Sequence, residues 1–186
     1  MSDPEPILTL EPLLVAVREG LVARGWELSG LQKTTSYEFE GRWAGDSSRS
    51  AYLFFHAEGV PDWVSIDVFL DETTRGLKGN LALVVDGPEL SQVRDPGKVL
   101  AHLAALAHRT LPQGYHTPLT LRYRLPKLDE SPAEADTEFR FKLYIPASAL
   151  RAGHSAVVAL AESTASAFRR ILDSPELEPF LAAEES

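Results

Sequence analysis

The sequence predicts one α+β domain that is built on an antiparallel sheet, in the order α-β-β-β(-β)-α-β-β-α. Three observations lead to this fold class. Apolar residues alternate in several short segments, they recur at helical spacing in three longer ones, and the segments are joined by short turn-rich connections. Short connections favour antiparallel neighbours, and a length of 186 residues suits a single domain. We assign residues 1–175 to this domain and residues 176–186 to an acidic tail.

The first helix is expected at residues 10–24. Thr9 is a candidate N-cap, Pro12 is tolerated in the first turn, and Gly25 stands just beyond the end. Five residues at helical spacing make one apolar face: Leu10, Leu13, Leu14, Val17 and Leu21. Another part of the protein must cover this face.

Four strands are expected next, as a meander. They are placed at residues 37–43, with Tyr37, Phe39 and Trp43 at alternate positions, and at residues 51–57, 64–70 and 81–85. The segment RGLKGN, residues 75–80, lies between the last two strands and is interpreted as a hairpin turn rather than a phosphate-binding loop.

The second half of the chain predicts a helix, two strands and a further helix. Asp95 and Pro96 begin the first of these helices, which ends before Pro112. Alternating residues then predict strands at 119–125 and 139–145. We expect one continuous final helix, capped by Ser148 and followed by Ser174 and Pro175.

Composition limits the classes of function. The net charge is -9 and the pI is about 5.0, which argues against bulk phosphate binding and favours basic partners, although an acidic surface also simply keeps a protein soluble. The chain has no cysteine, no apolar run that could span a membrane and no basic, apolar leader at its start. We therefore expect a cytoplasmic protein.

No constellation of catalytic or metal-ligating residues stands out, so we expect no enzyme activity, no cofactor and no metal. A nucleophile elbow of the form G-x-S-x-G is absent, and the five histidines lack ligand spacing: His102 and His108 are six residues apart, and the others are single. Asp67 lies within an apolar strand, where it is expected to face water. The alternative is an enzyme whose carboxylates meet in a pocket that the sequence does not reveal.

The strands carry more apolar side chains than one buried face needs. Four aromatic residues fall opposite the main apolar face and are candidates for protein interaction: Tyr52, Phe54, Trp63 and Phe69. Either helices cover both faces, or a partner chain completes the burial, as is common for contiguous apolar patches.

The last two predicted strands carry a basic strip on their outward positions. It consists of Arg122, Arg124, Arg140, Lys142 and Tyr144. Such a strip suits an acidic peptide or single-stranded nucleic acid. The alternative, favoured by the acidity of the chain, is a solvated face that is paired with Glu138 and other acids.

The order of elements from Thr9 to Asp173 resembles the YbjN family and, in topology, the class I type III secretion chaperones. The features that carry this resemblance are the opening helix ending at Arg24, Gly25 and Trp26, the aromatic strand around Tyr37 and Phe39, and the second helix after Asp95. The resemblance implies a bacterial protein without enzyme activity or cofactor, which dimerises and serves as a chaperone-like adaptor. It also implies a client in the DNA damage response, such as a DNA-repair or single-stranded-DNA-binding protein.

The function that the sequence predicts is therefore protein binding by a homodimeric, chaperone-like adaptor. Its client is expected to be a basic or nucleic-acid-binding protein, without strong direct binding of nucleic acid by this chain itself. An enzyme with a hidden pocket and a weak binder of single-stranded nucleic acid stay open as alternatives.

Overall fold

The computed structural model describes residues 4–36, 48–62, 64–86, 101, 102, 105, 106, 109 and 138–175. The predicted strands at 37–43 and 119–125 and the tail at 176–186 lie outside the described residues. The elements are α1 (Leu10–Ala23), β1 (Trp26–Ser36), β2 (Ser48–Ala57), β3 (Val64–Thr73), β4 (Gly76–Asp86), β5 (Glu138–Tyr144), α4 (Ala147–Ala152) and α5 (His154–Leu172). Residues 101, 102, 105, 106 and 109 are also helical, within the range predicted for the middle helix.

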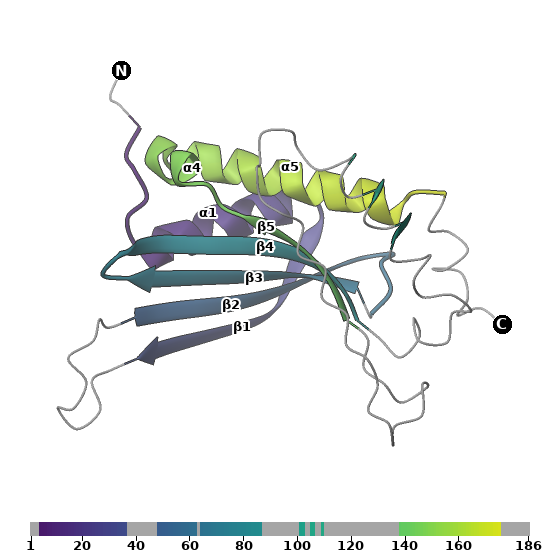
Figure 1. Cartoon of the computed structure of the whole chain (residues 1–186), viewed down its shortest axis with the longest axis horizontal. Helices are drawn as coiled ribbons and strands as arrows, with labels where there is room; N and C mark the ends of the chain where they lie inside the picture. The colour runs from purple at the N-terminus through teal and green to yellow at the C-terminus, as the bar shows by residue number, and fades with distance from the viewer. Residues whose placement is uncertain are drawn as a thin grey trace.

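The strands form one antiparallel sheet in the order β1-β2-β3-β4-β5, and α1, α4 and α5 lie on the same face of it (Figure 1). The α+β class and the antiparallel meander are confirmed. None of the described helices is long and apolar enough to span a membrane.

Alternation along the strands decides which residues face the helices. The inner face, turned toward the helices, carries the buried residues Ala51, Leu53, Phe55, Val64, Ile66, Val68, Leu70, Leu81, Leu83, Val85, Phe141 and Leu143. The intervening residues point to the opposite, outer face. The described helices leave that outer face uncovered (Figure 1).

The first strand begins earlier than the sequence predicted. β1 starts at Trp26, directly after Gly25, whose φ of 86° makes the turn out of α1. Trp26 is buried, whereas most of the following side chains are polar and exposed. A strand at the edge of a sheet needs no regular apolar pattern, which is why a search for alternating aromatic and β-branched residues missed the strand at residues 26–36.

The turn between β3 and β4 is a tight hairpin, as predicted, but it is shorter than the segment RGLKGN. Thr74 and Arg75 form the turn, and Gly76 begins β4 with a φ of 130°. Gly79 lies within the strand, where a Cβ atom would stand 2.8 Å from the side chains of Leu70 and Ile145. Gly79 is therefore a packing residue.

The predicted continuous final helix is wrong. Gly153, with a φ of 95°, separates α4 from α5, and the residue that precedes α4 is Pro146 rather than a capping Ser148. A Cβ atom at Gly153 would stand 2.6 Å from the carbonyl oxygen of Glu5. The break therefore lets the N-terminal segment pass close to the backbone between the two helices.

A carboxylate from β3 caps the start of α1. Thr9 makes no side-chain capping bond; instead the Leu10 N–H donates to Glu72 at 2.6 Å. Arg49 donates to Glu72 at 2.7 Å and to both carboxylate oxygens of Glu11, at 2.6 and 2.9 Å. These contacts fix the first turn of α1 to the start of β2 and the end of β3.

The two long helices pack most closely at Gly20 of α1. A Cβ atom there would stand 2.5 Å from the carbonyl oxygen of Val158 and 2.6 Å from the Cβ of Ala161. Gly20 is therefore required for the close approach of α1 and α5, although glycine is a poor helix former.

Gly20→Ala is expected to destabilise the protein by about 1 to 3 kcal/mol, because the overlap with α5 outweighs a gain in helix propensity of about 1 kcal/mol. The matched control is Ser163→Ala at an exposed position of α5, which should be neutral or slightly stabilising. Urea unfolding curves with a common slope measure both. A Gly20→Ala variant as stable as the control would mean that the helices are not closely packed there.

The network at the start of α1 makes stability depend on pH. Hydrogen bonds from Arg49 lower the pKa of Glu11 from its usual 4.5. A pKa that is lower in the folded than in the unfolded state adds stability above about pH 4.5, which is lost as the pH falls below that value.

Glu11→Gln should therefore lose little stability at pH 3 and more at pH 7, so that the difference in unfolding free energy from the parent protein grows with pH. The effect should be small, since Glu11 is exposed and water screens the ion pair. Urea midpoints at several pH values between 3 and 7 test this. A difference that is constant across the range would contradict the linkage.

Candidate functional site

The outer face carries one row of residues that crosses all five strands. In register, Gln32 of β1 is opposite Tyr52, Tyr52 is opposite Phe69, Phe69 is opposite Asn80, and Asn80 is opposite Tyr144. We call these five residues the cross-strand row. It brings together two predicted interaction residues, Tyr52 and Phe69, with Tyr144 of the predicted basic strip.

Aromatic rings form the centre of this row. The rings of Tyr52 and Phe69 are tilted by 39° with their centroids 4.8 Å apart, within the usual range for aromatic pairs. Tyr52 is 41% exposed, and Phe54 and Phe69 are half-buried. Trp63, the fourth predicted interaction residue, lies outside the described residues. The sequence thus placed three of these aromatic residues correctly on one face.

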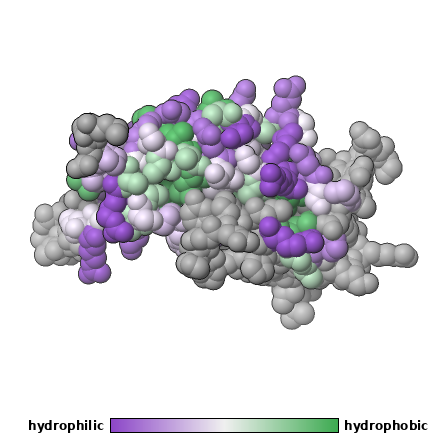
Figure 2. Space-filling model, turned by 90° about the horizontal axis from the view of Figure 1, so that it is seen from above, coloured by the Kyte–Doolittle hydropathy of each residue, from purple (hydrophilic) through white to green (hydrophobic). Residues whose placement is uncertain are grey.

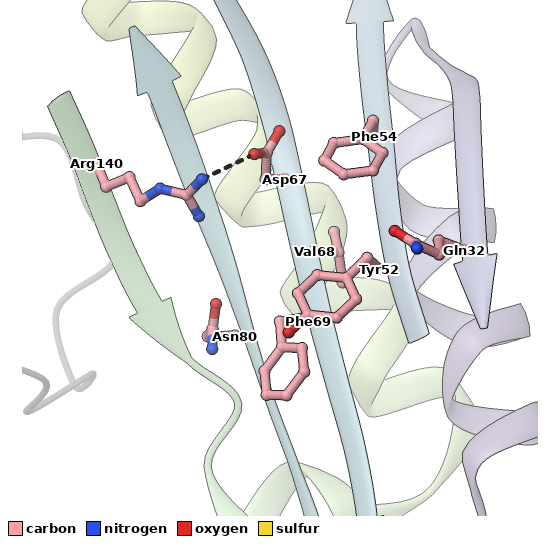
Figure 3. Close-up of a pocket in the computed structure, with 8 residues that line it drawn as sticks. All are labelled: Gln32, Tyr52, Phe54, Asp67, Val68, Phe69, Asn80 and Arg140. Carbon is pink, nitrogen blue, oxygen red and sulfur yellow. Dashed lines mark hydrogen bonds and ion pairs between the residues drawn. The ribbon is translucent and has the colours of Figure 1, made fainter. Parts of the chain in front are cut away.

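A pocket of about 310 Å³ opens on the outer face beside the aromatic pair (Figure 3). The described residues that line it are Gln32, Tyr52, Phe54, Asp67, Val68, Phe69, Asn80 and Arg140. Aromatic side chains lie at one side of the pocket, and the charged pair of Asp67 and Arg140 lies at its end (Figure 3). The pocket therefore combines apolar surface with a few polar groups, as ligand sites usually do.

Asp67 is not the solvated residue that the sequence predicted. Its side chain is 15% exposed, accepts a hydrogen bond from Ser65 at 2.8 Å and pairs with Arg140 at 3.3 Å. Since Arg140 is on β5 and Asp67 on β3, the pair spans β4, where Ala82 and Val84 are buried. A carboxylate that is largely removed from water needs such partners.

The basic strip is described only in its second half. Arg140, Lys142 and Tyr144 take alternate positions of β5 on the outer face, whereas Arg122 and Arg124 lie outside the described residues. Arg140 is engaged by Asp67. The aromatic candidates and the described part of the basic strip are thus parts of one surface, which the sequence treated as two sites.

The outer face carries a balanced charge over the described side chains. Three acids and three bases project from it: Glu27, Asp67 and Asp71, and Lys78, Arg140 and Lys142. Phosphate backbones are bound by an excess of Lys and Arg. The described part of the face has no such excess.

A serine and a histidine meet at the bulge of β1. The Ser29 hydroxyl donates to the Phe54 carbonyl at 3.0 Å and lies 2.7 Å from Nδ1 of His56. A hydroxyl has one proton to donate. Because the Ser29 hydroxyl donates it to the Phe54 carbonyl, the contact with His56 is a hydrogen bond from Nδ1–H to the Ser29 oxygen. This direction is opposite to that of a base that activates a serine, and no carboxylate among the described residues contacts His56.

Two site residues, Gln32 and Asn80, were not singled out from the sequence, and Asn80 is the buried one. It is 8% exposed, and no hydrogen bond from another described residue reaches its carboxamide. Its position opposite Phe69 depends on the register of β3 and β4, which the sequence did not establish. Groups of three or more residues that could hold a metal are absent from the described part of the chain.

A second exposed apolar surface lies on α1, on the helical side of the molecule. Val15 and Val22 of α1 are 54% and 49% exposed, and Leu8, which precedes the helix, is 76% exposed. In the view onto the helices, apolar residues gather between hydrophilic ones (Figure 2). We call these three residues the α1 seam. Val15 and Val22 lie on the same side of α1, because seven residues make about two helical turns, and their exposure shows that this side faces away from the core.

Comparison with family models, with curated proteins and with solved structures found no match to this chain. The resemblance to the YbjN family stays a prediction, and the function is argued from the geometry of the two surfaces.

Proposed function

We propose that the protein is a non-enzymatic, homodimeric adaptor that binds a client protein on the outer face of its sheet. The observation that carries this proposal is the exposed aromatic pair of Tyr52 and Phe69 beside a pocket of about 310 Å³, on a face that the described helices leave uncovered. Aromatic anchors next to pockets are typical of the energetic centres of protein interfaces. A chaperone-like role and a type III secretion chaperone-like fold belong to the same proposal.

Charge supports a protein client over a nucleic acid. The chain has a net charge of -9, and the outer face is balanced over its described side chains. A basic protein is attracted by such a chain, whereas a phosphate backbone is repelled. The client that we propose is therefore a basic or nucleic-acid-binding protein, and a role in the DNA damage response in the cytoplasm follows from the resemblance alone.

The alternative of an enzyme gains little from the pocket. Asp67 is the one carboxylate among the described residues that line it, and Arg140 and Ser65 already hold that carboxylate. A pair of carboxylates that could divide the roles of general acid and general base is therefore not among these lining residues.

The spacing of the α1 seam supports the homodimer. Val15 and Val22 lie on one exposed side of α1. An antiparallel α1 of a second copy, related by a two-fold axis at Val15, sets Val15 against its equivalent and one Val22 at either end of the contact. The surface is therefore self-complementary in apolar contacts, as a two-fold interface requires.

Val15→Glu should convert the dimer to a monomer, because it places two like charges at the two-fold axis. Light scattering should show twice the 20.4 kDa chain mass for the parent protein, with little change at high salt, and one chain mass for the variant. Tyr52→Glu is the matched control at a similarly exposed apolar residue on the outer face and should stay dimeric. A parent protein that is monomeric at micromolar concentration would count against the dimer.

Client binding should depend on Tyr52. With p-benzoylphenylalanine in place of Tyr52, ultraviolet light should cross-link a protein of the native host that the same residue at the exposed Ser163 of α5 does not capture. The purified captured protein should then bind Tyr52→Lys at least about tenfold more weakly than the parent chain, as expected for an interface anchor. Salt should slow association more than it speeds dissociation.

The variant counts only if its melting temperature is unchanged. Equal affinity of the captured protein for the parent chain and Tyr52→Lys would exclude the outer face as the client site. A gel shift of oligothymidylate by the isolated chain at physiological salt, lost on substitution of Lys142, would instead support the nucleic-acid alternative.

A further inference from the structure

The Asn80 carboxamide is a buried polar group whose partner must come from outside the described residues. Among the described residues, the other buried polar side chain is Thr164 of α5. It donates a hydrogen bond to the Leu160 carbonyl at 2.8 Å, as buried polar groups normally do. Asn80 is 8% exposed and receives no such bond. An unsatisfied amide in this position weakens the folded state.

The carboxamide belongs to the pocket on the outer face. Asn80 lines it next to Phe69, with Tyr52 on the following strand and the pair of Asp67 and Arg140 at the end of the pocket (Figure 3). A ligand that enters the pocket therefore meets an aromatic side and an unsatisfied amide at the same time. The second carboxamide of the cross-strand row belongs to Gln32, which is exposed on β1 at the opposite side of the pocket from Asn80.

We propose that this pocket recognises a peptide segment of the client by one large apolar side chain and the peptide group beside it. The side chain packs against Tyr52, Phe54 and Phe69, and the peptide group pairs with Asn80. This inference rests on the proposed function and specifies what the outer face binds.

The chemistry of a carboxamide favours a peptide group as its partner. Asparagine offers both an acceptor and a donor, and a peptide group offers the complementary donor and acceptor. Neither partner is charged, which suits a pocket where Asp67 and Arg140 already neutralise each other. An anionic ligand gains no net attraction from this neutralised pair.

The length of the row sets the length of the segment. Gln32 and Asn80 are three strand positions apart, or about 14 Å at about 4.8 Å per strand. An extended peptide covers that distance with about four residues, at about 3.3 Å each. The recognised segment is therefore short, with its apolar side chain near the Asn80 end.

The first test separates a binding role of Asn80 from a structural one. Asn80→Leu removes the unsatisfied amide at similar volume, so the melting temperature should be equal to or higher than that of the parent protein. The affinity for the client captured at Tyr52 should fall at least tenfold. Lys78→Leu, on the outer face of the same strand but not among the pocket residues, is the matched control and should leave the affinity unchanged.

The second test uses defined probes and the full chain. Titration with Ac-Ala-Phe-Ala-NHMe should shift the side-chain NH₂ signals of Asn80 in ¹⁵N NMR spectra, whereas Ac-Ala-Ala-Ala-NHMe and thymidine monophosphate should leave them in place. The phenylalanine peptide should not bind the Asn80→Leu variant.

The results distinguish this inference from the proposed function. If Tyr52→Lys weakens client binding but Asn80→Leu leaves it unchanged, or lowers the melting temperature, the peptide-group contact is wrong and the adaptor function stands. If the nucleotide shifts the Asn80 signals and the phenylalanine peptide does not, the inference fails. If no client depends on Tyr52, the proposed function fails by itself, and the probe titration still decides whether the pocket binds a peptide.

Discussion

The close crossing of α1 and α5 at Gly20 is the constraint on which the rest of the structure depends. Because Gly20 lacks a side chain, the two helices approach within contact of backbone and Cβ atoms and act as one layer. That layer covers one face of the sheet, so the residues at alternate positions of β2, β3 and β4 are buried beneath it. The opposite face then depends on side chains within the sheet, or on a partner, for its cover.

The outer face holds two arrangements that are costly for stability alone. The pair of Asp67 and Arg140 is partly removed from water, where the loss of hydration offsets much of the attraction between the charges. The Asn80 carboxamide is buried without a hydrogen bond from the described residues. Buried charges and polar groups without hydrogen bonds are rare elsewhere in a folded protein, and several of them at one place are expected at a functional site. Both lie in the same pocket, which supports assigning the function to this face.

The sequence predicted the features that follow from the two-residue period of a strand. It missed the features that depend on contacts between distant parts of the chain. Alternation in β2, β3 and β4 identified the inner residues and placed Tyr52, Phe54 and Phe69 opposite them, because side-chain direction follows directly from strand period. β1 was missed, since an edge strand such as WELSGLQKTTS carries no regular apolar pattern. The break at Gly153 was missed because it depends on the approach of the Glu5 backbone, a contact between distant parts of the chain.

The site was predicted only in part, for the same reason. Asp67 was predicted to face solvent, because alternation along β3 does not reveal that Arg140, two strands away, reaches across β4. Asn80 carries no signal in its neighbours Gly79 and Leu81; its meaning comes from its position opposite Phe69. Strand pairing therefore unites two groups of residues, the aromatic candidates and the β5 part of the basic strip, that were separate in the sequence.

The positions of the two proposed surfaces determine what kind of client the proposed dimer would suit. The α1 seam lies on the helical side and the aromatic pair on the opposite side of the sheet. A two-fold axis through the α1 seam therefore leaves both outer faces free and directed away from each other. Two short segments on one client, or on neighbouring copies of it, can then bind at once if the chain between them reaches around the dimer. Linked binding of this kind raises overall affinity without new contacts. In the proposed dimer, each pocket would therefore bind its segment weakly and exchange it quickly while the two pockets together retain the client.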